Sequence, residues 1–442
     1  MLKPEFPDTA AILLRNAVLP RAVVSQSALP GDNQLARADI LIVEESIKAI
    51  TAPGAIAAPD NAGVWDCRDG LVLPAFADIH THLDKGHIWP RRQNPDGTWM
   101  GALLAVAADR ESNWATDDVE RRMDFALRCA YAHGTAAIRT HLDSGPPQHE
   151  ISWASFDKMR ERWAGRIELQ AVALVGPDIM LDSAAYSTVA RRAQAGGGIL
   201  GGSVAVWPEA REAIFRAVEM AGALGMELDL HIDETLDVQS SALRHLADAV
   251  IETGYTGKVL AGHCCVLSVQ DERTAMATIE RVAEAGISVV SLPMCNIYLQ
   301  DRHNDPVGRT PRNRGVTLVN ELKAAGVKVA LASDNTRDPF YAYGDLDGVE
   351  VFRESARIAH FDHPQDGAWD WLRSVTSGAA EIAGFTYRGQ VAVGAPADLI
   401  LVNARNWTEL QSRPQADRVV LRAGRAIDAT LPDYRELDDL MR

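Results

Sequence analysis

The middle of the chain alternates between segments typical of strands and segments typical of helices, and this limits the possible folds more than any other feature. Strands are expected at eight places: 74–80, 136–140, 167–174, 199–206, 227–232, 258–263, 287–292 and 327–333. Helical segments rich in Ala, Glu and Arg separate most of them, at 117–133, 209–224, 239–253, 271–285 and 317–325. This alternation favours a parallel sheet, and eight units over roughly 300 residues fit a (β/α)₈ barrel of the TIM type. A doubly wound sheet competes, but no Gly-x-Gly-x-x-Gly loop supports it.

The two ends of the chain differ from this middle, because short strands and turns follow one another there. The expected end strands include 11–14, 40–43, 397–402 and 418–422. Strand-rich ends that flank a different middle suggest one small domain built from both termini. We therefore predict a β-sandwich-like domain of residues 1–75 and 386–442, and a barrel of residues 76–385.

Composition limits the partners and the compartment. The formal net charge of -16 argues against a nucleic-acid partner, which would need a basic face. We expect no membrane association, because no apolar run approaches spanning length. The five cysteines include no Cys-x-x-Cys, so neither a disulfide framework nor a thiolate zinc site is expected. Since the N-terminus lacks the pattern of a signal peptide, we expect a cytoplasmic protein.

Polar residues stand at the ends of several predicted strands. The first strand runs into His80 and His82, which share a face because they are two residues apart. Later strands end in His231, His263 and Asp334. The carboxyl ends of barrel strands share one rim, so we expect these side chains to meet. Neutral imidazoles and a carboxylate suit a divalent ion such as zinc or iron, which activates water for hydrolysis.

Further candidates lie in the loops that follow these strands. Glu234, three residues after His231, could move protons between water and substrate, although a solvent-facing Glu at a helix start is the alternative. Lys85 could contact an oxygen or an anionic group of a substrate, unless it is a surface ammonium paired with Asp84. Trp99, in the loop after the first strand, could form a pocket wall or simply pack that loop.

Several of these residues stand in motifs that resemble those of the amidohydrolase superfamily, specifically its bacterial cytosine deaminase branch. The matching motifs are His80-Thr81-His82-Leu83-Asp84, Arg139-Thr140-His141-Leu142-Asp143, Asp229-Leu230-His231-Ile232-Asp233-Glu234, Ala261-Gly262-His263 and Ser333-Asp334-Asn335. The resemblance implies that His80, His82, His231 and Asp334 hold one divalent metal ion, Zn²⁺ or Fe²⁺. It also implies that Glu234 shuttles the proton and that His263 contacts the attacking water. The strand at 201–206 has no Lys, which the two-metal members of the superfamily need.

The implied reaction is hydrolytic deamination of an amino-substituted nitrogen heterocycle, in which ammonia leaves and a ring carbonyl remains. The recognition groups depart from those of cytosine deaminases at three positions. Gly176 stands where those enzymes carry Gln, Asn335 where they carry a second Asp, and Phe340 where the family often has Trp. A pocket discriminates strongly when its hydrogen-bonding partners change. We therefore expect a small-molecule substrate other than cytosine, such as a pterin, a triazine, a purine-like ring or a modified pyrimidine.

Two alternatives keep the fold but change the function. The same site could cleave a cyclic amide or remove an N-alkylamine from a triazine. A non-catalytic scaffold is the alternative of another class, although such relatives typically lose metal ligands. Relatives often assemble, so a homo-oligomer is also considered. No role is assigned to His141, to Asn296 or to the arginine-rich loop 302–314.

Overall fold

The computed structural model describes residues 6–26, 28–302, 308–363 and 365–442. The chain forms two compact units. The first, here the β-rich unit, contains Met1–Ala77, Cys129–Ala137 and Asp347–Leu431. The second, here the barrel unit, contains Asp78–Arg128, Ile138–Leu346 and Pro432–Arg442. Both ends of the chain contribute to the β-rich unit, and the predicted division at residues 75 and 386 stays a prediction.

The β-rich unit contains two four-stranded sheets, in the orders β3-β2-β1-β4 and β16-β15-β14-β5. Their strands are β1 (Ala11–Pro20), β2 (Leu35–Val43), β3 (Ser46–Thr51), β4 (Gly63–Asp66), β5 (Val72–Pro74), β14 (Leu399–Leu401), β15 (Val419–Arg422) and β16 (Arg425–Ala426). Leu14 and Ile40 of the first sheet share one buried apolar cluster with Leu399 and Leu421 of the second. Removal of these side chains from water stabilises the packing of the two sheets. The unit also holds η1 (Arg21–Val23), α11 (Gly348–Ile358), η3 (Gln365–Val375), α12 (Ser377–Ala383) and α13 (Trp407–Ser412).

The central sheet has eight strands, and its order follows the chain from β6 to β13. The strands are β6 (Phe76–Thr81), β7 (Thr135–Asp143), β8 (Glu168–Leu174), β9 (Ile199–Val204), β10 (Leu228–Ile232), β11 (Val259–His263), β12 (Ser288–Ser291) and β13 (Val329–Leu331). A parallel bridge between Thr81 and Asp334 joins the two ends of the sheet. The sheet therefore closes into the predicted (β/α)₈ barrel, and the doubly wound alternative is wrong.

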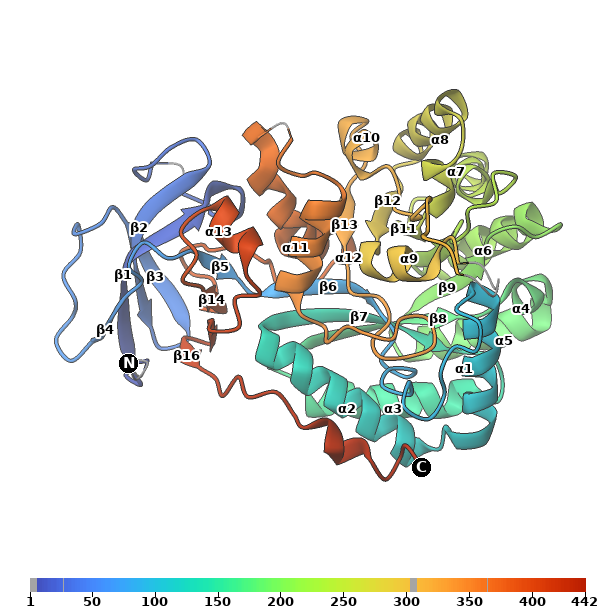
Figure 1. The fold of residues 1–442 in the computed structure, drawn as a ribbon, viewed down its shortest axis with the longest axis horizontal. Coiled ribbons are helices and arrows are strands. Elements are labelled where there is room, and N and C mark those ends of the chain that lie inside the picture. Colours follow the sequence, from blue (N-terminus) through green and yellow to red (C-terminus); the bar gives the residue numbers. More distant parts are fainter. Residues whose placement is uncertain (1–5, 27, 303–307, 364) are drawn as a thin grey trace. The chain divides into compact units, whose positions relative to one another are not determined.

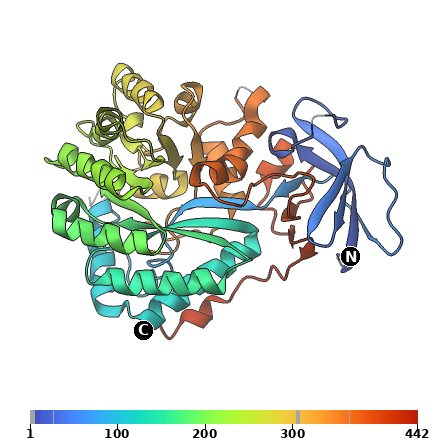
Figure 2. The ribbon, with the colours of Figure 1, turned by 180° about the vertical axis from the view of Figure 1, so that it is seen from behind.

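Helices follow most of the barrel strands. They are α1 (Trp99–Asn113), α2 (Thr116–His133), α3 (Gln148–Arg162), α4 (Pro177–Leu181), α5 (Ser183–Ala195), α6 (Ala210–Leu224), α7 (Ala242–Thr253), α8 (Glu272–Glu284), α9 (Pro293–Leu299) and α10 (Val319–Ala324), with the short turns η2 (Cys265–Ser268) and η4 (Tyr434–Leu437). Figures 1 and 2 show α6, α7 and α8 beside β9 to β12. Gly225 ends α6 in the left-handed region, with a φ of 63°.

One local prediction about the active-site loops is wrong. Trp99 was expected in a loop, but it is the first residue of α1. The helix begins there because the side chain of Thr98 accepts a hydrogen bond of 2.9 Å from the N–H of Gly101. The helix is hard to predict because Ala and Gly occupy much of its buried side, including Gly101, Ala102 and Ala105.

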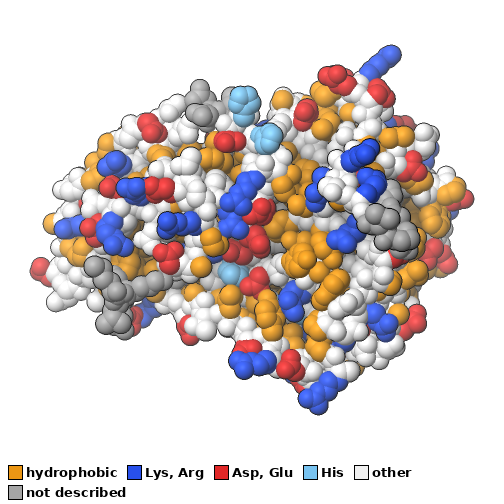
Figure 3. Space-filling model, viewed as in Figure 1, with side chains coloured by type: hydrophobic (Ala, Val, Ile, Leu, Met, Phe, Trp, Pro, Cys, Tyr) orange, Lys and Arg blue, Asp and Glu red, His pale blue; other side chains and the backbone are white. Residues whose placement is uncertain are grey.

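The surface is mixed in character. Figure 3 shows acidic and basic side chains interspersed over one face, with a group of hydrophobic side chains near its centre. Exposed apolar residues include Met100 and Leu104 of α1, which are 54% and 62% exposed. Among the helices that the structure describes, none is long and apolar enough to cross a bilayer.

Candidate active site

The side chains expected at the barrel rim lie together in the barrel unit. His80 is in β6, and His82 comes directly after that strand. His231 is in β10 and His263 is the last residue of β11, while Asp334 follows β13. The backbone N–H of Asp334 donates to the carbonyl of His80 at 2.9 Å. The closure of the barrel thus places the last carboxylate beside the first imidazole.

Three imidazole nitrogens and one carboxylate oxygen converge in this cluster. Nε2 of His231 lies 3.1 Å from Nε2 of His80 and 3.1 Å from Nε2 of His82. Oδ1 of Asp334 lies 3.2 Å from Nε2 of His82 and 3.7 Å from Nε2 of His80. A tetrahedral ion with bonds of about 2.0–2.2 Å separates its ligand atoms by roughly 3.3 Å. The spacing of these atoms therefore fits one small divalent ion.

The protonation states of the cluster also fit a cation. Burial lowers the pKa of His80, His82 and His231 well below the ordinary range of histidine, and neighbouring imidazoles lower it further. Burial raises the pKa of Asp334 well above its usual range, and the nearby charge of Glu234 acts in the same direction. In the part of the chain that is described, neither oxygen of Asp334 accepts a hydrogen bond from a nitrogen or hydroxyl donor. A bound cation would supply the missing partner of this carboxylate.

The backbone is strained at two of these positions. His263 and Asp334 have φ angles of 69° and 65°, in the left-handed region that non-glycine residues rarely adopt. Such a conformation costs about 1–3 kcal/mol per residue, and it clusters at functional sites where the surrounding structure enforces it. In both cases the turn occurs at a strand end. It directs the side chain to the rim of the barrel.

Glu234 lies beside the cluster, in the turn after β10. Its Oε1 is 3.6 Å from Nδ1 of His263, and its Oε2 accepts a hydrogen bond of 2.8 Å from the indole N–H of Trp99. Burial raises the pKa of Glu234 to about 7, although the hydrogen bond from Trp99 opposes this shift. A carboxyl group with a pKa near neutrality can both take and give a proton at physiological pH. The position suits proton transfer next to the cluster.

Comparison with known proteins places this site in a family. Residues 183–428 match the amidohydrolase family. The chain is also 54% identical over 435 residues to a pterin deaminase of Rhizobium rhizogenes, with 98% of each chain covered. The chain belongs to the amidohydrolase family.

Two more distant similarities extend the comparison. An N-isopropylammelide isopropyl amidohydrolase of Pseudomonas sp. is 24% identical, over 82% of this chain and 87% of the relative. The crystal structure of 5-methylcytosine deaminase from Klebsiella pneumoniae with 5-fluorocytosine has a TM-score of 0.78 at 24% identity, and it covers 96% of this chain and 98% of that chain. The structural likeness confirms the predicted barrel fold.

These similarities also confirm the predicted enzyme class. The amidohydrolase is a hydrolytic deaminase, in agreement with the resemblance to the cytosine deaminase branch. The alternative of a non-catalytic scaffold finds no support in them. The roles of individual residues stay predictions.

Three of the predicted substrate contacts form a connected group in the amidohydrolase. Lys85 is only 5% exposed, and its Nζ lies 4.9 Å from the ring centroid of Phe340. The ring of Phe340 in turn meets the ring of Trp99 edge to face, at 6.1 Å between centroids. Because Trp99 also donates to Glu234, this group borders the predicted proton shuttle. The alternative that Lys85 is a surface ammonium is wrong, because its side chain is buried.

The other two predicted substrate contacts, Gly176 and Asn335, differ in their surroundings. Gly176 precedes α4, and a Cβ added there would meet only the carboxylate of Asp178 within 4 Å. The amide N–H of Asn335 donates to Oδ2 of Asp338 at 2.8 Å, and its carbonyl oxygen lies 3.7 Å from Sγ of Cys295. The Asn335 amide is therefore bonded to its own loop.

Two residues without an assigned role lie in the site. Nδ2 of Asn296, on α9, is 3.0 Å from Nδ1 of His263. The ring of His141, in β7, is centred 4.1 Å from that of His80 and 4.5 Å from that of His231. Within the described residues, neither nitrogen of His141 has a hydrogen-bond partner. Their motifs are visible in the sequence, but only the fold shows what they contact.

The arginine-rich loop 302–314 is described in part, because residues 303–307 lie outside the described residues. Arg309 pairs with Asp301 at 2.6 Å, and Arg314 donates to the carbonyl of Ile297. These arginines bind the loop to itself and to α9.

Proposed function

We propose that this amidohydrolase is a one-metal deaminase whose substrate is a pterin, a bicyclic ring with an amino group at one carbon and an oxo group nearby. The observation that carries the choice of ring is the 54% identity to a pterin deaminase across 98% of both chains. The departures at Gly176, Asn335 and Phe340 from the cytosine deaminase pattern support a ring other than cytosine.

In this proposal His80, His82, His231 and Asp334 hold the metal, which is zinc or iron. The converging atoms and the buried carboxylate support this choice. When bound, a divalent ion supplies an activated water nucleophile and positive charge at the reacting carbon. The low pKa values of the three histidines mean that no proton has to leave an imidazole before the ion binds.

Glu234 performs the proton transfers in this proposal. Its carboxyl group, with a pKa raised by burial to about 7, can protonate the ring nitrogen beside the reacting carbon. It can then take the proton of the added hydroxyl and pass it to the leaving amine as the ring carbonyl forms. The indole N–H of Trp99 donates a hydrogen bond to Oε2. Oε1, which lies beside Nδ1 of His263, is therefore the oxygen available for proton transfer. His263 or Asp334 takes the proton of the attacking water.

The substrate ring lies against the group of Trp99, Phe340 and Lys85 in this proposal. The aromatic side chains offer a flat apolar wall to a planar ring. The buried ammonium of Lys85 is placed to donate to a ring oxygen. Gly176, where cytosine deaminases carry Gln, adds no side chain to the pocket and so leaves room for the second ring of the substrate.

The test incubates the purified protein with pterin, cytosine and N-isopropylammelide, and measures ammonia, alkylamine and the ring product together with metal content. We expect ammonia and the oxo product from pterin, at one equivalent of zinc or iron per chain. Release of isopropylamine would instead support the triazine alternative. Conversion of cytosine in preference to pterin would contradict the proposed substrate.

A cytoplasmic location and a homo-oligomer belong to the same proposal. All five cysteines are buried and free, which suits a reducing compartment. Cell fractionation tests the location, and light scattering of the purified protein tests the assembly.

A further inference from the structure

The loop between β6 and α1 carries Lys85 in an environment that restrains its ammonium group. Nζ of Lys85 lies 4.0 Å from Oδ1 of Asp143, and Oδ2 of Asp143 accepts a hydrogen bond of 2.7 Å from Arg110. The same Nζ lies over the ring of Phe340. Because Asp143 is shared with Arg110, it leaves Lys85 with donors to spare for a further partner.

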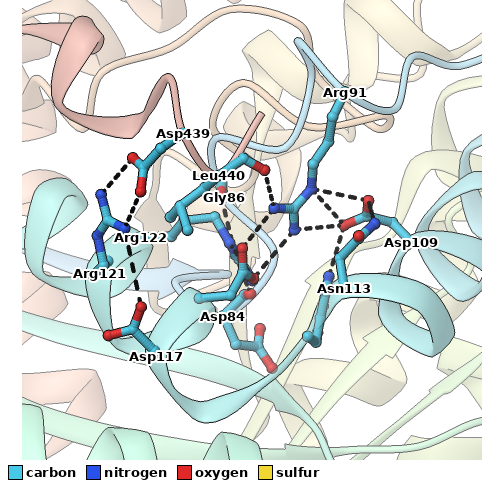
Figure 4. A network of polar contacts seen from close by, with 12 residues as sticks. Asp84, Gly86, Arg91, Asp109, Asn113, Asp117, Arg121, Arg122, Asp439 and Leu440 are labelled. Carbon is cyan, nitrogen blue, oxygen red and sulfur yellow. Dashed lines mark hydrogen bonds and ion pairs between the residues drawn. The ribbon is translucent and has the colours of Figure 1, made fainter. Parts of the chain in front are cut away.

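The backbone on both sides of Lys85 is held by a single side chain. Arg122, in α2, has no exposed surface, and its Nη1 donates to the carbonyl of Asp84 and, at 3.1 Å, to the carbonyl of Gly86. These carbonyls belong to the residues directly before and after Lys85. Figure 4 shows the guanidinium of Arg122 directed at this part of the loop.

Arg122 is itself oriented by a buried ionic network. Oδ2 of Asp118 accepts hydrogen bonds of 2.9 and 2.6 Å from Arg122, and the same carboxylate pairs with Arg91. Arg91 also binds Asp109 and, at 2.8 Å, the carbonyl of Leu440 in the C-terminal segment. Figure 4 shows the contacts of Arg91 with Asp109 and Leu440, and Figures 1 and 2 show the C-terminal segment alongside α2.

The network contributes more to geometry than to stability. A buried ion pair often contributes little net stability, because desolvation offsets the attraction between the charges. Its contacts are nevertheless directional, since the planar guanidinium donates in a fixed fork. Here Nε and Nη2 of Arg122 bind Asp118, and this leaves Nη1 to donate to the carbonyls of Asp84 and Gly86, the residues on either side of Lys85.

We propose that Arg122 is a positioning residue for substrate binding: it fixes the backbone on both sides of Lys85 and so places the ammonium group for an oxo group of the heterocycle. The inference rests on the proposed function for its substrate. Arg122 touches neither the metal cluster nor the substrate wall, and it acts through Lys85.

The matched control is the preceding residue on the same helix. Arg121 pairs with Asp439 at 2.7 Å and donates to the carbonyl of Glu436, and it is partly exposed. Arg122→Met and Arg121→Met therefore remove the same group from adjacent positions. We expect Arg122→Met to raise KM for pterin about tenfold or more with a much smaller change in kcat, because a small displacement of a binding group weakens its contact. Arg121→Met should stay within about twofold of the wild type.

A double-mutant cycle tests whether Arg122 acts through Lys85. Lys85→Met should raise KM at least as much as Arg122→Met, and the double variant should be no worse than Lys85→Met alone. Arg122→Lys should restore part of the loss, since an ammonium can reach one of the two carbonyls. Additive effects of Arg122→Met and Lys85→Met, or equal effects of Arg121→Met and Arg122→Met, would overturn the proposal.

Two further measurements test the role of Arg122 if a variant does not fold or if pterin is not the substrate. If Arg122→Met does not fold, Asp118→Asn keeps the volume and removes the charge that orients Arg122, and an unchanged KM in that variant overturns the proposal. If the wild type releases no ammonia from pterin, the proposed function fails instead. The same comparison on the heterocycle that is deaminated then decides the role of Arg122.

Discussion

Asp39 in the β-rich unit and Asp334 at the barrel rim are buried to the same degree, with 1% of each residue exposed, but their surroundings differ. Oδ1 of Asp39 accepts the N–H of Asn16 at 2.9 Å, and Oδ2 accepts the N–H of Gly54 at 2.8 Å. Oδ1 of Asp334 lies near the imidazoles of His80 and His82, and neither oxygen accepts a hydrogen bond from a nitrogen or hydroxyl donor of the described residues.

This difference in hydrogen bonding distinguishes a carboxylate with a structural role from one that is available to bind a ligand. A buried polar group with its hydrogen bonds made is part of the fold. A buried charge without them is costly, and a protein retains it where an ion or a substrate completes the site. The predictions below test that distinction in order of expected effect.

Asp334→Asn should cause the largest change. Loss of the carboxylate removes a metal ligand, so we expect kcat/KM to fall by more than about a hundredfold and the metal content to fall with it. In protein freed of metal by a chelator, the variant should unfold at a higher temperature than the wild type, because the amide carries no charge that burial must desolvate or neutralise by protonation. Retention of activity and metal would contradict the assignment of Asp334.

Glu234→Gln tests the proton shuttle beside the same cluster. The amide keeps the volume and can still pack against Trp99, but it cannot carry a proton between ring and amine. We expect kcat to fall about a hundredfold or more while the metal content stays that of the wild type. Elemental analysis of both proteins, alongside steady-state kinetics, checks this result. Loss of metal together with activity would show that Glu234 supports the metal site instead.

Asp39→Asn is the counterpart in the β-rich unit. The amide nitrogen cannot accept a hydrogen bond, so one of the two backbone donors that Asp39 now serves loses its partner. We expect the free energy of unfolding to fall by about 1–3 kcal/mol, as measured by urea denaturation, with or without metal. The kcat/KM of the folded variant should match the wild type. A specific loss of activity would break the distinction between the two carboxylates.

His87→Asn should change the dependence of stability on pH. Burial lowers the pKa of His87 to about 3 in the folded state, against 6.5 when unfolded. The unfolded state therefore binds the extra proton between these values, so stability present above pH 6.5 is lost as the pH falls toward 3. By pH 5 the protonation of His87 in the unfolded state lowers the free energy of unfolding of the wild type by about 2 kcal/mol. The variant lacks this contribution.

The control for His87→Asn is His360→Asn. His360 is exposed and also has a left-handed backbone, with a φ of 53° against 66° for His87. Asn tolerates this conformation well, so both substitutions suit the backbone. Urea denaturation at pH 7 and pH 5 should show a flatter pH dependence for His87→Asn alone. Equal slopes in all three proteins would exclude His87 as the cause.

Much of the fold could be predicted from local pattern. The alternation of strand-like and helix-like segments and the polar residues at strand ends are readable in the chain, and they led to the barrel and to His80, His82, His231 and Asp334. The start of α1 at Trp99 could not be read in this way. Its N-cap is a single threonine, and the small residues on its buried side make the apolar periodicity of the helix weak.

The sequence by itself determined the architecture and the types of ligand at the rim, because both follow from short-range periodicity and from the side of the strand on which a residue stands. Only the tertiary structure decided which groups touch. Trp99 reaches Glu234 across 135 positions, and Arg122 reaches the carbonyls of Asp84 and Gly86 across 38 and 36 positions. Such contacts depend on how strands and helices pack in three dimensions, and no local pattern encodes that packing.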